Sequence, residues 1–121
     1  NFANIQAPVY VQARLQRDVL RREIKRAFTN VDLLITPTMP GPPVLIAQGA
    51  DPDAFSNPNT PPFDVLGLPT ISVPCGFTTS GLPIGLQIAG APFAESTVLA
   101  LAHAYEHATE WHQRRPKSSP G

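Results

Sequence analysis

The chain has 121 residues, which suffices for one small domain with a modest core and is too short for two. Nine Lys and Arg residues balance nine Asp and Glu residues, so no net charge attracts nucleic acid or an anionic membrane. A single cysteine excludes an internal disulfide framework and predicts a reducing compartment, the cytoplasm. We find no membrane-spanning apolar run and no leader pattern, and the missing initiator methionine predicts that the chain begins inside a longer protein.

The first predicted element is an amphipathic helix from Pro8 to about Phe28. Apolar residues recur there at helical spacing, and Pro8 suits a first turn. Arg17 lies on the apolar stripe between Ala13 and Leu20, where a half-buried guanidinium needs an anionic or carbonyl partner. Arg17 is therefore a candidate binding residue, whereas the other basic residues of this helix read as a solvated surface.

A short apolar and β-branched run at 33–36 predicts a strand buried on both faces, in a parallel or mixed sheet. Proline and glycine are so frequent between residues 39 and 62 that little regular structure is expected there. A loop of this length usually walls a pocket or contacts a partner.

The second half predicts a β-hairpin followed by a helix. The runs 70–73 and 84–88 are separated by turn residues around Gly81. A final helix is expected from about Glu95 to His112, with one apolar stripe and a frayed tail at 116–121. The apolar stripe of this last helix consists of Val98, Leu101, Ala102, Tyr105, Ala108 and Thr109. The sequence thus predicts an α/β fold with at least three strands and two long helices.

No residue set in this chain predicts hydrolytic chemistry by itself. Ser72 lies in a predicted strand without a nucleophile elbow, and Ser56 and Ser80 lie in loops where serine commonly makes local hydrogen bonds. Cys75 would be a nucleophile only beside a histidine, and a single cysteine near a strand end is more often a small buried hydrophobe. We therefore predict no catalytic residue here.

Two histidines raise the question of a metal site. His103 and His107 are four residues apart on the last helix, a spacing that can place two imidazoles on one metal. The glutamate between them, Glu106, is displaced from its place in the H-E-x-x-H motif, and no third ligand is evident. A solvated helix face with a Glu110–Arg114 pair is therefore the better interpretation. Nucleotide-binding glycine motifs and basic-aromatic surfaces are also missing, and we predict no metal, no cofactor and no nucleic acid.

Several short motifs occur in one order between Val31 and Pro116. They are Asp-Leu-Leu-Ile-Thr-Pro-Thr at 32–38, Leu-Gly-Leu-Pro-Thr-Ile-Ser-Val-Pro-Cys-Gly at 66–76, Gly-Leu-Pro-Ile-Gly-Leu-Gln at 81–87 and Phe-Ala-Glu at 93–95. Together with Tyr10 and Arg17, they resemble the C-terminal portion of the amidase signature family. The resemblance implies an α/β/α fold with a mixed sheet covered by helices, of which residues 1–121 form the C-terminal portion of a single domain.

The resemblance also implies an activity and a partner. Family members cleave carboxylic amides through a Ser-Ser-Lys triad that lies upstream of this region, and no part of that signature occurs here. The chain alone is therefore expected to be inactive, with the upstream half of the same amidase as its partner and a small-molecule amide as the substrate.

The resemblance points to five substrate-binding residues. Arg17 matches the arginine with which the A subunits of glutamine-dependent tRNA amidotransferases grip a substrate carboxylate, a role that suits a guanidinium fork. Asn57 stands where those subunits hold the substrate ammonium with an aspartate, and its neutral side chain favours a general amide over free glutamine. Thr38 and Met39, in the loop to Pro43, and the turn near Phe63 are expected to wall the pocket.

Other interpretations stay open. The chain could belong to an amidotransferase A subunit, or it could be a free-standing binding module without catalytic function. A buried strand with few neighbours predicts marginal stability or self-association of the chain, as in a homodimer.

Overall fold

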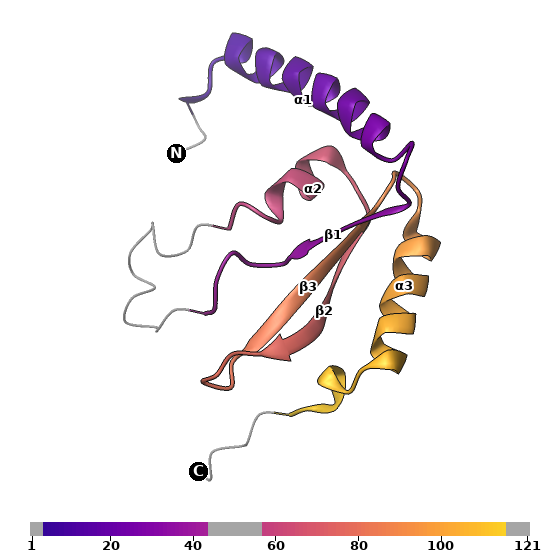
Figure 1. Ribbon diagram of the computed structural model, residues 1–121. Coiled ribbons are helices and arrows are strands. Elements are labelled where there is room, and N and C mark those ends of the chain that lie inside the picture. The colour runs from indigo at the N-terminus through magenta and orange to yellow at the C-terminus, as the bar shows by residue number, and fades with distance from the viewer. Residues whose placement is uncertain (1–3, 44–56, 116–121) are drawn as a thin grey trace.

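The computed structural model describes residues 4–43 and 57–115 of the chain. In chain order the elements are α1 (Ala7–Ala27), β1 (Leu33–Pro37), α2 (Pro61–Leu66), β2 (Thr70–Phe77), β3 (Pro83–Gly90), α3 (Glu95–Ala108) and the short 3-10 helix η3 (Trp111–Gln113) (Figure 1). The predicted α/β class, with three strands and two long helices, is confirmed. Ser56, most of the proline-rich loop and the tail at 116–121 lie outside the described residues.

The three strands form an antiparallel sheet in the order β1-β3-β2. β2 and β3 are the predicted hairpin, and its turn is closed by the N–H of Thr78, which donates to the carbonyl of Leu82 at 2.8 Å. Cys75 is the extra residue of a bulge, because Pro74 pairs with Gly85 while Gly76 pairs with Ile84.

The described residues differ in two respects from the parallel pairing and two-sided burial considered for the first strand. β1 pairs with β3 in the antiparallel direction, and Ile35 is 56% exposed, so β1 is not buried on both faces among the described residues. Apolar runs of this kind occur both in buried parallel strands and in edge strands with one uncovered face. Hydrophobicity alone does not distinguish these two kinds of strand.

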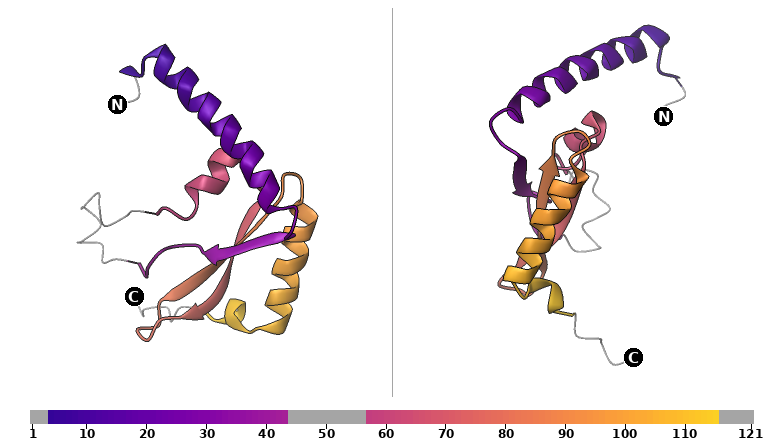
Figure 2. Two further views of the ribbon diagram at one scale, coloured as in Figure 1. Left: turned by 45° about the horizontal axis from the view of Figure 1, so that its top comes forward. Right: turned by 90° about the vertical axis from the view of Figure 1, so that its right-hand side faces the viewer.

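The core lies between one face of the sheet and α3 (Figure 2). Val73 and Ile88 of the sheet are buried against Val98 and Ala102 of the helix. The close approach requires a glycine, because a β-carbon at Gly90 would lie 2.7 Å from Cγ2 of Val98. The stripe predicted for the last helix is therefore confirmed in its central part, where Leu101 and Tyr105 also pack against the core.

The helix α1 forms with Pro8 in its first turn, as predicted, but it buries none of its residues. It crosses above α2 and extends beyond the sheet (Figures 1 and 2). Its main polar attachment is the guanidinium Nε of Arg21, which donates to the carbonyl of Leu66 at the end of α2 over 3.0 Å. Among the helices of the described residues, α1 included, none is long and apolar enough to cross a membrane.

Two predicted boundaries differ from the structure. α2 begins at Pro61, inside the region expected to be irregular, because prolines at the first positions of a helix give up no intrahelical hydrogen bond. The last helix ends at Ala108 instead of His112, since Thr109 has an extended backbone. Glu110 and Arg114 instead flank the 3-10 helix η3, and no ion pair between them occurs in the described part of the chain.

Candidate functional site

The sheet surface opposite α3 carries a polar region, and we call this region the polar face. Side chains of directly paired residues point to the same side of a sheet, and successive residues alternate. Ile88 pairs with Ile71 toward α3, so Gln87, which pairs with both Thr36 and Ser72, lies on the other side. The polar face consists of Thr36, Thr38, Ser72, Gly85 and Gln87.

Gln87 is the buried centre of the polar face, with only 2% of its surface exposed. Its Nε2 donates to the hydroxyl of Thr36 at 3.0 Å and to the carbonyl of Asn59 at 3.1 Å. Asn59 in turn donates through Nδ2 to the carbonyl of Pro37 at 3.0 Å. These bonds fasten the segment before α2 onto β1 and β3, and a buried amide without such partners would be costly.

A pair of hydroxyl groups lies next to this centre. The side-chain oxygens of Thr38 and Ser72 are 2.5 Å apart, in a solvent-accessible position. Gly85 lies beneath them, and a β-carbon there would be 2.8 Å from each oxygen. The glycine thus leaves the space in which the two hydroxyls meet. Such a pair can donate to a ligand carbonyl and accept from a ligand N–H.

Asn57 organises the turn that precedes α2. Its Nδ2 donates to the hydroxyl of Thr60 at 2.8 Å, and its Oδ1 accepts the backbone N–H of Asn59 at 3.1 Å. This arrangement is typical of asparagine in turns. Asn57 is therefore connected through Asn59 to the polar face, and so to Thr38.

Met39 and Phe63 occupy the surroundings of the polar face. Met39 is exposed and lines a mainly apolar hollow of about 320 Å³, together with prolines of the following loop and Ile84 of β3. Phe63 is half-buried in α2, and its carbonyl accepts the N–H of Leu68 at 3.0 Å. Thr38, Met39 and Asn57 are thus brought to one region of the fold, whereas Phe63 lies on the neighbouring helix.

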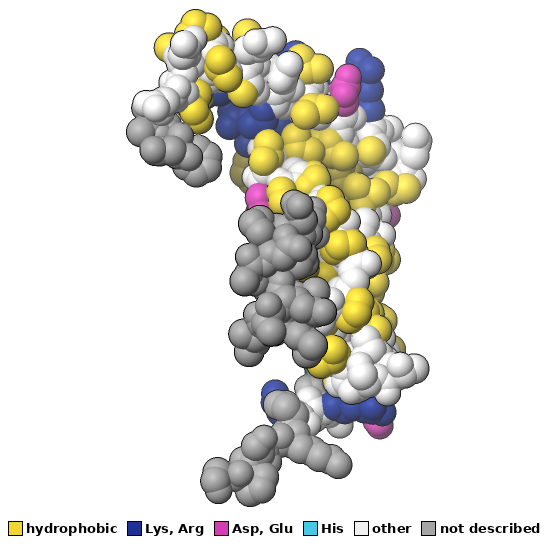
Figure 3. Space-filling model, turned by 90° about the vertical axis from the view of Figure 1, so that its left-hand side faces the viewer, with side chains coloured by type: hydrophobic (Ala, Val, Ile, Leu, Met, Phe, Trp, Pro, Cys, Tyr) yellow, Lys and Arg dark blue, Asp and Glu magenta, His cyan; other side chains and the backbone are white. Residues whose placement is uncertain are grey.

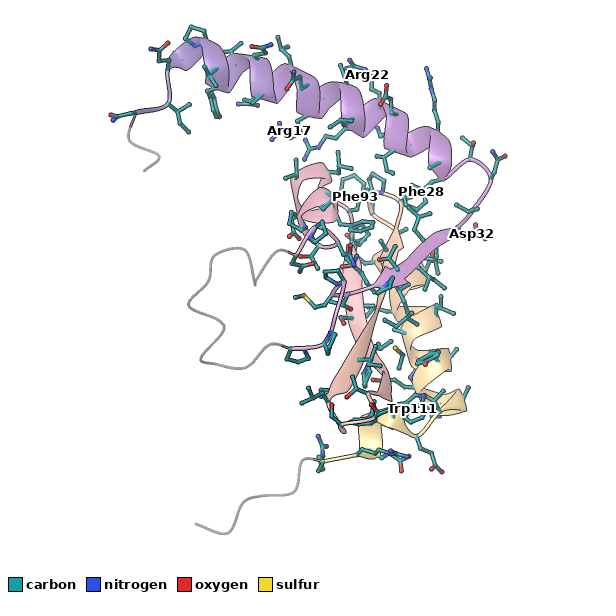
Figure 4. The ribbon with its side chains drawn as sticks, turned by 60° about the vertical axis from the view of Figure 1, so that its left-hand side comes forward. Arg17, Arg22, Phe28, Asp32, Phe93 and Trp111 are labelled. Atoms are coloured by element: carbon teal, nitrogen blue, oxygen red, sulfur yellow. The ribbon has the colours of Figure 1, made fainter. Side chains whose placement is uncertain are left out.

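Arg17 lies apart from these four residues, on the side of α1 that faces α2 (Figure 4). It is half-buried, as the sequence predicted, with a side chain 31% exposed. Its Nη2 is 3.4 Å from Oδ1 of the neighbouring Asp18, while its Nε is buried without a hydrogen-bond partner in the described residues. A guanidinium held in this way keeps donor capacity for a further carboxylate or carbonyl.

The described residues contain no hydrolytic constellation. The hydroxyl of Ser72 is bonded to Thr38 and to no histidine, lysine or carboxylate there. His103 and His107 lie edge-to-face with ring centroids 4.3 Å apart on α3, the helix that covers the opposite face of the sheet. No group of three metal-ligating side chains occurs within 4–43 and 57–115. The arrangement can bind and orient a ligand, but within the described residues it has no nucleophile paired with a base, as cleavage of a ligand would require.

Sequence reasoning missed Thr36, Asn59, Gly85 and Gln87, and it treated Ser72 as an ordinary strand serine. One signal was available. Gly85 and Gln87 alternate with Leu86 and Ile88, so a strand otherwise apolar on one face places a glycine and an amide on the other. The contribution of Asn59 depends on the path of a loop, and its spacing from β3 in the sequence gives no hint of it.

Comparison with known proteins adds independent information. A family model described as Amidase matches residues 2–99. The A subunit of glutamyl-tRNA(Gln) amidotransferase from Moorella thermoacetica is 46% identical over 111 residues, which are 89% of this chain and 23% of that protein. A solved structure of 6-aminohexanoate cyclic dimer hydrolase complexed with substrate superposes with a TM-score of 0.78, at 29% identity over 94% of this chain and 27% of that one.

A crystal structure of an amidase superposes with a TM-score of 0.76, at 30% identity, and covers 86% of this chain and 26% of the amidase. The chain therefore spans about a quarter of the length of these proteins.

Proposed function

The chain belongs to the amidase family, and on that premise we propose that residues 1–121 form the C-terminal portion of a single amidase domain. The complete domain would hydrolyse a carboxylic amide to a carboxylate and ammonia or an amine. The observation that carries the proposal is the polar face, because it places ligand-binding groups beside an apolar hollow and offers no nucleophile with a base.

The division of labour follows from the chemistry of amide cleavage. A nucleophile must attack the carbonyl carbon, and the amine must leave with a proton. Water must then release the acyl group as a carboxylate. In our proposal a Ser-Ser-Lys set outside this chain performs these steps, and no cofactor is involved. This chain contributes a pocket wall made of Thr38, Met39, Asn57 and Phe63, with Arg17 as a further binding residue.

The substrate we propose is a general amide. The carboxamide of Asn57 carries no charge and already bonds Thr60 and Asn59, so it offers little to a substrate ammonium. Within 4–43 and 57–115 no group accepts a hydrogen bond from Nε of Arg17, which suits a substrate with a carboxylate or a second carbonyl. An amide with an anionic or polar group remote from the scissile bond fits both residues.

A second candidate is the A subunit of a glutamine-dependent tRNA amidotransferase. The observation that favours it is the 46% identity to the Moorella thermoacetica protein, well above the identity to the solved amidases. In this case the ammonia would pass to a partner subunit. We place either protein in the cytoplasm, which suits the single half-buried cysteine.

A chimaeric protein tests the proposal. The 121 residues replace the aligned segment of the Moorella thermoacetica protein, and ammonia release is measured on glutamine and on simple aliphatic and aromatic amides. We expect turnover by the chimaera and none by the 121-residue chain alone. A chimaera that folds but neither hydrolyses an amide nor reacts with a fluorophosphonate probe contradicts the proposal.

Two variants of the chimaera separate the candidates. Arg17→Leu is expected to raise KM for amides that carry a carboxylate and to leave neutral amides unchanged. Asn57→Asp is expected to shift preference toward glutamine, since it restores a charge opposite the ammonium. A chimaera that prefers glutamine with Asn57 intact favours the amidotransferase.

A further inference from the structure

Phe93, in the turn between β3 and α3, combines two unfavourable features. Its side chain is 92% exposed, and its φ is +66°, the only positive φ at a non-glycine residue in the described part of the chain. A bulky residue rarely adopts the left-handed backbone region, and exposure of a large apolar ring to water is unfavourable. The turn is closed by the N–H of Ala94, which donates to the carbonyl of Ala91 at 3.0 Å. Such strain persists only where the surrounding structure maintains it, so the combination points to a role of Phe93 beyond the turn itself.

The ring of Phe93 lies at the edge of an open hollow. Figure 4 shows Phe93 beneath the C-terminal half of α1, in the space next to α2. The hollow has a volume of about 290 Å³, and its walls come from α1, from the end of α2 and from the turn at Pro92 and Phe93. A second apolar side chain can therefore enter beside the ring without displacing a helix.

The helix α1 also carries exposed apolar side chains, which lie N-terminal to its residues that line this hollow. Val9 and Leu20 lie near one side of the helix, while Val11, Leu15 and Val19 lie on the other. All five are between 43% and 62% exposed. Figure 3 shows hydrophobic side chains along α1 and on the surface below it, with a small basic patch between them. The apolar side chains of α1 are interspersed with basic residues, and because the helix buries none of its residues, its apolar side has no covering layer among the described residues.

We propose that α1 and Phe93 form the surface on which the remaining part of the amidase packs, with Phe93 inserted into it as the anchor. This inference rests on the proposed function. The occupant is identified by length, because the chain matches relatives of which it spans only 23%. An aromatic side chain that fills a pocket of its partner is the usual form of an energetic centre in an interface.

The test compares Phe93→Gly in two settings. In the 121-residue chain, glycine relieves the positive φ and removes no buried contact, so the thermal midpoint rises by about 2–5 °C. In the chimaera, the same change removes the anchor, so the midpoint falls. The opposite signs distinguish an interface anchor from a residue that merely shapes the turn. Phe93→Leu keeps an apolar side chain and is expected to recover part of the loss in the chimaera.

Leu82→Gly is the matched control. Leu82 is an exposed apolar residue in the turn at the far end of the hairpin, with no positive φ. It is expected to lower the midpoint in both settings by similar amounts.

If Phe93→Gly leaves the thermal midpoint of the chimaera unchanged, the inference is overturned and the proposed function stands. A chimaera that does not fold overturns the proposed function itself. A chimaera that is a dimer in sedimentation, and a monomer as Phe93→Gly, identifies a second copy as the occupant and also overturns the inference.

Discussion

The network around Gln87 can be tested quantitatively by a double-mutant cycle. Gln87→Leu removes two donated hydrogen bonds, of 3.0 and 3.1 Å, from a side chain that is 2% exposed. Each such bond contributes about 1 kcal/mol net, and the acceptors left unpaired add to the loss. We therefore expect the free energy of unfolding of the 121-residue chain to fall by about 1–3 kcal/mol. The partner variant, Thr36→Val, leaves the bond to Asn59 intact and is expected to cost about 1 kcal/mol.

The double variant carries the decisive information. Because the bond between Gln87 and Thr36 is lost only once, the double variant is expected to be about 1 kcal/mol more stable than the sum of the single losses predicts. Urea unfolding measures all four proteins, with the fluorescence of Trp111, the only tryptophan, as the signal. Additive losses, or a Gln87→Leu variant as stable as the wild type, would refute the network.

Two further predictions concern packing. Gly90→Ala is expected to destabilise the chain by about 1–3 kcal/mol, because the new β-carbon would lie 2.7 Å from Cγ2 of Val98. Val98→Ala in the same chain should restore part of the loss. Gly41→Ala is the control, since its β-carbon meets nothing within 4 Å, and it should leave stability unchanged in the same urea titration. Arg114→Ala removes a guanidinium that lies 5.1 Å from the ring of Trp111, so the emission maximum of Trp111 should shift and stability should fall by about 0.5–1 kcal/mol, and an unchanged spectrum would contradict the contact.

The sequence predicted the elements well where periodicity is strong. The hairpin of β2 and β3 is bounded by turn residues, and the apolar stripe around Val98 and Ala102 lies against the sheet as expected. The surroundings of α1 could not be predicted in the same way, because the pattern of an amphipathic helix shows that it has an apolar side and does not say what covers it.

The site could be predicted only in part. Thr38 and Asn57 are predicted through a resemblance, and the structure connects them through Asn59, a residue that no local pattern singles out. Gln87 could have been found from strand alternation, since it is the polar residue between Leu86 and Ile88. The direction of β1 depends on its neighbour in space, and a five-residue apolar strand carries no signal for that choice.

The most direct test of the account measures ammonia release and serine labelling on the 121-residue chain and on the chimaera, side by side at equal molar concentration. The substrates are the panel of simple amides, and the label is a fluorophosphonate. We expect only the chimaera to release ammonia and to become labelled, because in our proposal this chain supplies pocket and packing surface, and its described residues hold no nucleophile beside a base. Turnover by the 121-residue chain with a label on Ser72 or another of its serines would contradict the account.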